Sequence, residues 1–354
     1  MVRSSSLCDP GVTDPHEVPI VMQDAETRIS CWPTTATKNS ASRRRIVGEK
    51  LRTLGRSLAE FLPQNNAIPR LKYLVDLSRY KRKHRIAPID GFSLVLTTRN
   101  RREFLACAVA AVVANTQEPF EIIIMDNASD DGSEELCHYL EAANPGVVRH
   151  VRLQRNIGTN AYALGFLQAQ YKFLVDMDDD ILALSKGWDR AVIDAFGAFP
   201  RLGFLAMNVV QDEYTNGAKK GCTEYADVSQ SHTTLQLGPT GGWFSATTRE
   251  IYNEVGGFVF RPYKPFPPED GKYIQKLKRH GYFAGILKNK YVYHASGPYW
   301  NLAYGYQAIW DEKYRRDHKD HLPLIRNVRL RDVPSVEYAE RMVIKSEQSL
   351  AFSA

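Results

Sequence analysis

The amino-acid sequence predicts an α/β fold in which a mostly parallel sheet is flanked by helices. Three observations favour it: strand-like and helical segments alternate from residue 91, polar clusters follow the strands, and 44% of the residues are hydrophobic. Strands that alternate with helices form crossover units and therefore a parallel sheet. A chain of 354 residues with this apolar content suffices for one large domain with extensions.

The first half of the pattern is regular. The strand-like segments are short, apolar and rich in β-branched residues, and each is followed by a stretch with helical periodicity. In parallel sheets ligands bind beyond the carboxyl ends of the strands, where this chain places polar clusters. We expect strands at 92–98, 120–126, 147–153 and 171–177, and helices at 102–114, 131–143 and 159–170.

The second half has a looser rhythm. A helix is expected at 267–282, because acidic residues in its first turn and basic residues in its last turn suit the helix dipole. The chain beyond about residue 320 is charged and predicts irregular structure. The other expectations are a strand at 203–210, a loop or hairpin at 211–232, a Gly-rich turn with a short strand and a helix at 238–258, and a strand that ends at His294.

The N-terminal quarter differs from the rest in composition. Residues 1–40 are rich in Ser, Thr, Pro and Asp and predict disorder, whereas 41–90 predict a basic amphipathic helical extension. That helix either packs on the main domain, which we favour, or contacts anionic lipid through 42–85, which liposome co-sedimentation distinguishes. No aromatic-interleaved groove accompanies the basic run, so nucleic acid is not an expected partner.

Cysteine usage and hydropathy predict a cytoplasmic protein, with a peripheral position at the membrane as the alternative. The five cysteines are scattered and form no CxxC pair, which favours a reducing compartment over a disulfide framework or a zinc site. No segment has the roughly 20 consecutive apolar residues of a membrane-spanning helix, and no leader peptide is expected.

An acidic cluster at 172–181, KFLVDMDDDI, raises the question of its counter-charge. Four carboxylates, those of Asp176, Asp178, Asp179 and Asp180, follow an apolar run. Neighbouring ionised carboxylates repel, and each costs several kcal/mol when desolvated without a partner. A D-x-D spacing is typical of a divalent cation held by oxygen ligands, and the alternative is a solvated acidic turn.

Six motifs in order, between residues 91 and 300, resemble the family 2 glycosyltransferases, which have the Rossmann-like GT-A fold. They are LTTRNR, IIIMDNASDDGS, RNIGTNAYALG, VDMDDDI, TGGWFSATTREIYNEVGGF and PPEDGKY. The resemblance implies a nucleotide-binding half at 91–182, an acceptor half at 183–300 and a C-terminal extension at 301–354. It implies transfer of a sugar, with inversion, from a nucleotide-diphosphate donor (a UDP-sugar is favoured) to a hydroxyl of a carbohydrate, lipid-linked or small-molecule acceptor.

The resemblance also implies roles for individual residues. Asp270 corresponds to the catalytic base, with a helix cap as its alternative role. Mn²⁺ or Mg²⁺ would be held by Asp178 and Asp180 with His294, and a second register uses Asp176 with Asp178. Implied donor contacts are Thr97, Arg99, Asp126, Asn156, Gly158, Asp178 and Asp179. Implied sugar and acceptor contacts are Gly241, Gly242, Trp243 and Glu269, although a core position is an alternative for Trp243.

Two other functions compete with this interpretation. A nucleotidyltransferase that makes nucleotide sugars shares the parallel sheet and the metal-bound carboxylates, but it favours a Gly-rich loop after the first strand. This chain has TTRNRREF there, without glycine. A basic protein that binds membrane or nucleic acid without catalysis is the second alternative. The oligomeric state is not predicted by the sequence.

Overall fold

The computed structural model describes residues 71–72, 75–76, 78, 88–212, 214–215, 219, 224–261, 269–305 and 335–351. The disorder predicted for 1–40 lies outside these residues, as does most of the helical extension predicted for 41–90. None of the helices within the described ranges is long and apolar enough to cross a membrane.

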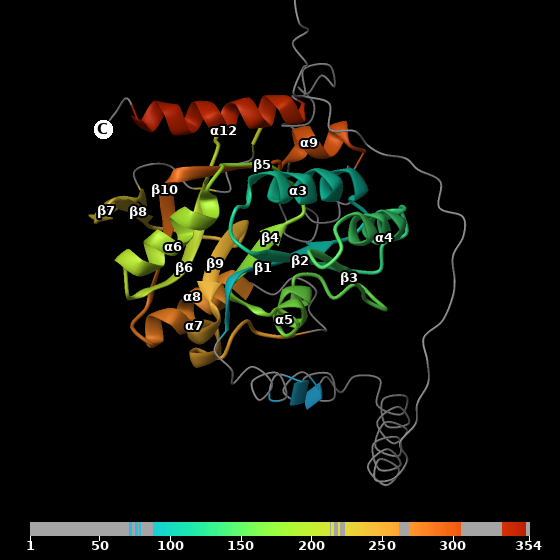
Figure 1. The fold of residues 1–354 in the computed structure, drawn as a ribbon, viewed down its shortest axis with the longest axis horizontal. Helices are drawn as coiled ribbons and strands as arrows, with labels where there is room; N and C mark the ends of the chain where they lie inside the picture. Colours follow the sequence, from blue (N-terminus) through green and yellow to red (C-terminus); the bar gives the residue numbers. More distant parts are fainter. Residues whose placement is uncertain are drawn as a thin grey trace, which may run out of the picture. The chain divides into compact units, whose positions relative to one another are not determined.

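The described residues form a ten-stranded mixed sheet (Figure 1). Its strands are β1 (Ile89–Thr98), β2 (Phe120–Asp126), β3 (Val148–Arg152), β4 (Tyr171–Asp178), β5 (Ile181–Leu184), β6 (Leu202–Val209), β7 (Ala226–Gln230), β8 (Thr233–Leu237), β9 (Phe244–Thr248) and β10 (Phe283–His294). The order is β3–β2–β1–β4–β9–β6–β10–β8–β7, and β5 pairs with β10. Strands β1 to β4 are parallel, β6 pairs in parallel with β10, and β9 joins the two groups in antiparallel pairing. The predicted mixed, mostly parallel sheet is confirmed.

Helices cover both faces of the sheet (Figure 1). One face packs against α3 (Arg102–Asn115), α4 (Ser133–Ala143) and α6 (Trp188–Ala198). The other packs against α5 (Asn160–Phe166), α7 (Arg249–Glu254) and α8 (Glu269–Arg279). Side chains alternate along a strand, and Leu174 of β4 belongs to the second core. Asp176 and Asp178 therefore point to the face that carries α5 and α8.

The C-terminal part of the chain differs from the predicted irregular structure. Helix α12 (Val336–Ala351) packs against β10 and β5, and the short α9 (Pro298–Ala303) follows β10. Ala339 and Val343, four residues apart, are buried in a cluster with Tyr293 and Trp300. The helical spacing is present in the sequence, but charged residues surround it, and burial of the apolar positions depends on β10.

Two further elements were not expected. Helix α6 buries Trp188, Val192 and Ala195, which recur at helical spacing in the sequence. Strand β5 has only four residues and is defined by its pairing with β10, which is a tertiary contact. Within the segment predicted as a loop or hairpin, β7 pairs with β8 of the following chain in an antiparallel hairpin.

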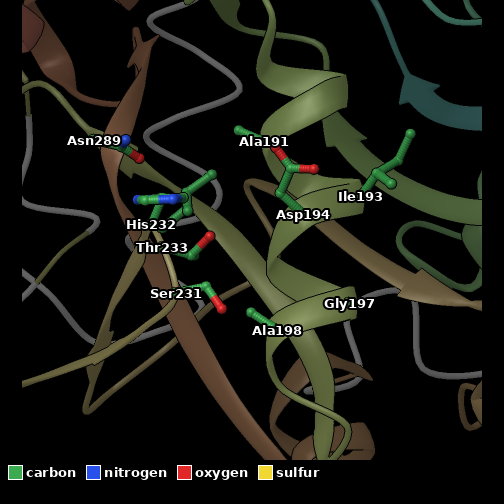
Figure 2. Close-up of a pocket in the computed structure, with 10 residues that line it drawn as sticks. Ala191, Ile193, Asp194, Gly197, Ala198, Ser231, His232, Thr233 and Asn289 are labelled. Carbon is green, nitrogen blue, oxygen red and sulfur yellow. The ribbon is translucent and has the colours of Figure 1, made fainter.

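A cavity of about 510 Å³ lies between α6, the β7–β8 turn and β10 (Figure 2). His232, Asp194 and Asn289 present polar groups to it, and Gly197 and Ala198 of α6 form part of its wall. It contains none of the residues that the sequence associates with catalysis or donor binding.

Two helical glycines provide a matched test of how tightly the sheet is packed. Gly165 and Gly197 are the penultimate residues of α5 and α6. A Cβ added at Gly165 would lie 2.3 Å from Val95 Cγ1 and 3.2 Å from Met125 Cγ, whereas one at Gly197 meets no heavy atom within 4 Å. Helix α5 thus rests directly on β1 and β2, while Gly197 borders the open cavity.

We expect Gly165→Ala to lower the free energy of unfolding by about 1–3 kcal/mol, because the methyl group overpacks the contact with Val95. Gly197→Ala should raise it by up to about 1 kcal/mol, because alanine restricts the unfolded chain and favours helix. Urea unfolding of both variants checks this. Equal effects of the two substitutions would contradict the close packing of α5.

Candidate active site

The register of the parallel strands brings the predicted site residues to one edge of the sheet. Thr97 at the end of β1 is paired with Asp178 at the end of β4, and Thr98 is paired with Asp126 at the end of β2. Since the strands are parallel, their carboxyl ends meet at the same edge. The three motifs that follow these strands therefore share one neighbourhood.

The acidic run forms the turn between β4 and β5. Strand β4 pairs with β1 and β9, whereas β5 pairs with β10. Strand β4 ends at Asp178, the chain turns at Asp179 and Asp180, and β5 begins at Ile181. Ile181 is paired with His294 of β10, and the Ala295 N–H donates to the Asp180 carbonyl over 2.8 Å. This turn therefore carries the acidic residues from the β1–β4 part of the sheet to the end of β10.

The turn gathers three potential metal ligands. One ligand atom each from Asp178, Asp180 and His294 lies within 4.8 Å of the others. His294 Nε2 is 2.9 Å from Asp180 Oδ1 and 3.3 Å from Asp178 Oδ2. Asp180 and His294 are buried, whereas Asp178 is partly accessible. This grouping corresponds to the Asp178–Asp180 register, and Asp176 of the alternative register is not part of it.

The chemistry of these atoms fits a divalent cation. His294 Nδ1 is buried and makes no hydrogen bond with the described residues, and the buried Asp180 Oδ1 faces His294 Nε2 at 2.9 Å without hydrogen-bond geometry. Although burial lowers the pKa of His294, the charges of Asp180 and Asp178 outweigh it and raise this pKa to about 9. The cluster thus attracts positive charge. Two carboxylates and an imidazole are acceptable ligands for Mn²⁺ or Mg²⁺.

Arg101, which the sequence did not single out, provides a second counter-charge. Its Nη1 donates to Asp179 Oδ1 over 2.6 Å and its Nη2 donates to Asp180 Oδ2 over 2.8 Å. Asp179 was expected to contact the donor, but its buried carboxylate is paired with Arg101. The only signal in the sequence was the arginine-rich run after the first strand. No local sequence pattern predicts that Arg101 contacts Asp179 and Asp180, which lie 78 and 79 positions further along the chain.

A second group of carboxyls, those of Asp176, Glu269 and Asp270, lies near Asp178. Glu269 and Asp270 occupy the first turn of α8, and Asp270 lies close to the glycine pair that precedes β9. A Cβ at Gly242 would be 2.6 Å from Asp176 Oδ2 and 3.4 Å from Asp270 Cβ. Only glycine fits here without displacing Asp176. Burial raises the pKa of Asp176 well above its ordinary range, and the charges of Asp178 and Asp270 add to this.

Two hydroxyl groups connect α5 and its preceding loop to these carboxyls. Thr159 Oγ1 donates to Glu269 Oε2 over 2.7 Å. Burial raises the pKa of Glu269 to about 7, although the bond from Thr159 opposes the shift. The Tyr162 hydroxyl lies 3.0 Å from Asp178 Oδ1 and 2.9 Å from the Met177 carbonyl. Neither hydroxyl was predicted, since both depend on how α5 packs against β4 and α8.

Two residues predicted to contact the nucleotide-sugar donor, Arg99 and Asn156, make hydrogen bonds within the loops at this edge. Arg99 Nη1 donates to the carbonyls of Asn127 and Ala128, at 2.8 and 3.1 Å. Asn156 Oδ1 accepts from the Gly158 N–H over 2.8 Å, in a local turn where Gly158 has φ +57°. These are the turn interactions that such residues commonly make. Their contacts with a nucleotide stay predictions.

Asp126 is fully buried, and both of its oxygens accept hydrogen bonds. The Ser129 N–H donates to Oδ1 over 2.9 Å and Arg152 Nη1 donates to Oδ2 over 2.7 Å, while His150 Nε2 is 3.9 Å from Oδ2. Burial raises the pKa of Asp126, but its interactions with His150, Ser129 and Arg152 outweigh burial and lower it to about 2. A ribose or base would therefore meet a carboxylate already bound to the protein.

Trp243 occupies the core rather than an open sugar-binding surface. Its indole is 5% exposed, belongs to the core on the α3 and α6 face, and donates from Nε1 to the Met207 carbonyl over 2.9 Å. The Asp178 N–H donates to its carbonyl over 3.0 Å. The structure thus favours the alternative role of Trp243, as a support for the end of β4.

Comparison with known proteins supports the predicted resemblance. Residues 93–254 match the family model described as glycosyl transferase family 2. The poly-β-1,6-N-acetyl-D-glucosamine synthase of Staphylococcus aureus is 29% identical over 121 residues, which are 34% of this chain and 29% of the synthase. The chondroitin synthase of Escherichia coli is 32% identical over 110 residues, 30% of this chain and 15% of that protein.

Solved structures of glycosyltransferases also resemble the chain. A mannosyltransferase of Pyrobaculum calidifontis, in complex with GDP-Man and Mn²⁺, has a TM-score of 0.46 at 17% identity and covers 85% of this chain and 88% of its own. S. aureus TarS in complex with UDP-GlcNAc has a TM-score of 0.44 at 14% identity, with 58% and 59% covered.

The interactions of Asp126 predict a specific pH dependence of stability. Its folded pKa of about 2 lies below the ordinary value near 3.9, so its stabilising effect is complete above about pH 4 and is lost between about pH 4 and 2. Near pH 7 we expect Asp126→Asn to lower the free energy of unfolding by about 2 kcal/mol. Urea unfolding at several pH values measures it.

The difference between wild type and Asp126→Asn should shrink as the pH falls from about 4 to about 2, because the Asp126 carboxyl then takes up a proton in the unfolded chain before it does so in the folded protein. Asp194→Asn is the control, since this exposed carboxylate makes a surface ion pair with Arg190 at 3.7 Å and should change stability little. A pH-independent difference for Asp126→Asn would contradict the ionic role of this residue.

Proposed function

We propose that the protein is an inverting, metal-assisted glycosyltransferase, on the premise that residues 93–254 match the glycosyl transferase family 2 model. It moves a sugar from a nucleotide-diphosphate donor, with a UDP-sugar favoured, to a hydroxyl of a carbohydrate, lipid-linked or small-molecule acceptor. The chain spans 29% of the length of the curated synthase that it matches, so the proposal concerns this domain.

The observation that carries the proposal is the convergence of Asp178, Asp180 and His294 at the carboxyl ends of the strands. When bound there, Mn²⁺ or Mg²⁺ would neutralise the charge that develops on a departing nucleoside diphosphate. The partly accessible Asp178 lies at the open side of the cluster, and Tyr162 orients its carboxylate from α5. A donor diphosphate would approach the cluster from this side.

The acceptor hydroxyl requires a base on the opposite side of the transferred sugar, because inversion occurs in one displacement. The position of Asp270 supports this role: it lies in the first turn of α8, beside Gly241 and Gly242 and near Asp176. The missing side chains of the two glycines leave room for an acceptor to approach the carboxylate. Asp270 Oδ1 accepts only from the adjacent Gly271 N–H, over 2.6 Å, among the hydrogen bonds resolved for this carboxyl.

The competing functions receive less support. A nucleotidyltransferase would share the parallel sheet, but the family match and the curated relatives all concern glycosyl transfer. A cytoplasmic location stays part of the proposal, with peripheral membrane contact through 42–85 as the alternative to packing on the main domain. Most of that segment lies outside the described residues. The relatives named for polymer synthesis make a carbohydrate acceptor the first one to test.

We expect a panel of UDP-, GDP- and dTDP-sugars to identify a donor whose nucleoside diphosphate is released only with Mn²⁺ or Mg²⁺. Removal of the metal by EDTA should abolish release, and readdition should restore it. Asp178→Asn should reduce turnover on the order of 100-fold, because it removes the ligand common to both metal registers. A fully active Asp178→Ala enzyme, or no release with any donor, would contradict the proposal.

Asp270→Asn should reduce turnover by roughly 10²- to 10⁴-fold, because the amide cannot accept the proton of the acceptor. Donor affinity, measured by calorimetry with the nucleotide sugar, should stay close to wild type. Asp194→Asn is the control and should leave turnover unchanged, since this exposed carboxylate lies on α6, outside the candidate site. Loss of donor binding in Asp270→Asn would indicate a structural role instead.

A further inference from the structure

We propose that Arg101 is a positioning residue for the metal site, which holds the acidic turn so that Asp180 offers one oxygen to a divalent cation. The inference rests on the proposed function and deepens it, because it assigns a role to a residue outside the ligand set. Arg101 does not belong to the cluster of ligand atoms and acts through its two aspartate partners.

The geometry of the guanidinium supports this role. Its two terminal nitrogens donate to different residues, Nη1 to Asp179 Oδ1 at 2.6 Å and Nη2 to Asp180 Oδ2 at 2.8 Å. With Oδ2 of Asp180 bound to Arg101, Oδ1 is directed to His294 Nε2 at 2.9 Å. A forked, planar guanidinium can hold two carboxylates at once, which the single ammonium of lysine cannot do in the same geometry.

Aromatic side chains pack against the guanidinium of Arg101. Its guanidinium carbon lies 4.6 Å from the centroid of the Phe104 ring, on the first turn of α3. Phe104 contacts Tyr304, with centroids 4.6 Å apart, and Tyr304 stacks on Trp300 of α9 at 6.2 Å. Helix α9 follows His294 by four residues. The same packed segment thus supports the arginine that holds Asp180 and the chain that carries His294.

Arg101 has two physical effects that change the affinity for a cation in opposite directions, so an affinity measurement can separate them. As a charge, Arg101 repels a cation at the neighbouring cluster, and its removal would strengthen cation binding. As a positioning group, it keeps the Asp180 carboxylate in the ligand orientation, and its removal would weaken binding. The short hydrogen bonds and the buried stack favour the positioning effect.

The test measures Mn²⁺ affinity of the metal-stripped full chain, by the EPR signal of free Mn²⁺, without donor or acceptor. The variants are Arg101→Lys, Arg101→Met and the double variant Arg101→Met with Asp179→Asn. The double variant removes one carboxylate that Arg101→Met leaves buried and unpaired, so it stays informative where Arg101→Met unfolds. Arg190→Met is the matched control, since this arginine pairs with Glu118 and Asp194 at the surface. Circular dichroism confirms that each variant is folded.

We expect the dissociation constant for Mn²⁺ to rise roughly tenfold or more in Arg101→Lys and in the double variant, and to stay at the wild-type value in Arg190→Met. An unchanged constant in Arg101→Lys, or a lowered one in the double variant, would overturn the positioning role while the proposed function stands. A wild-type protein that binds no Mn²⁺ would overturn both.

Discussion

The burial of consecutive carboxylates at the end of β4 is the constraint on which the rest of the site depends. Asp179 and Asp180 are almost inaccessible to solvent, and such groups are stable only beside positive charge. Arg101 supplies that charge on one side of the turn. The ligand atoms of Asp180, Asp178 and His294 converge on the other side, where the proposed divalent cation would complete the compensation. The turn between β4 and β5 therefore requires positive charge from segments that are distant in the sequence, such as Arg101.

The side of the site that carries Glu269 and Asp270 depends on a different constraint, the close approach of the backbone to two carboxyl groups. The chain before β9 passes so near Asp176 and Asp270 that a side chain at Gly242 would collide with a carboxyl oxygen. Helix α8 places Glu269 and Asp270 at this point because Tyr273 and Leu277, on its buried face, pack into the core below. The hydrogen bond from Thr159 to Glu269 joins α8 to the loop before α5. The candidate base therefore has a rigid support.

The C-terminal helices form part of the same support. Tyr293 lies next to His294 on β10 and is fully buried, and its hydroxyl lies 3.2 Å from Asp212 Oδ2. Tyr338 of α12 also donates to this oxygen, over 3.2 Å, and Lys290 of β10 pairs with Glu347 of α12 at 3.0 Å. These contacts fix the strand that carries His294. Residues outside the six sequence motifs therefore contribute to the geometry of the Asp178, Asp180 and His294 cluster.

The sequence by itself determined the order of the elements from β1 to β4, the strand that ends at His294, and the motifs that follow the strands. These features are local: side-chain period, turn residues and a short acidic run can be read within a few residues. Only the tertiary structure decided which carboxylate meets which cation. Arg101 and Asp179 are 78 residues apart, Thr159 and Glu269 are 110 apart, and the indole of Trp243 is directed to the core by its contact with Met207. Such pairs depend on strand order and helix packing, and no local pattern encodes them.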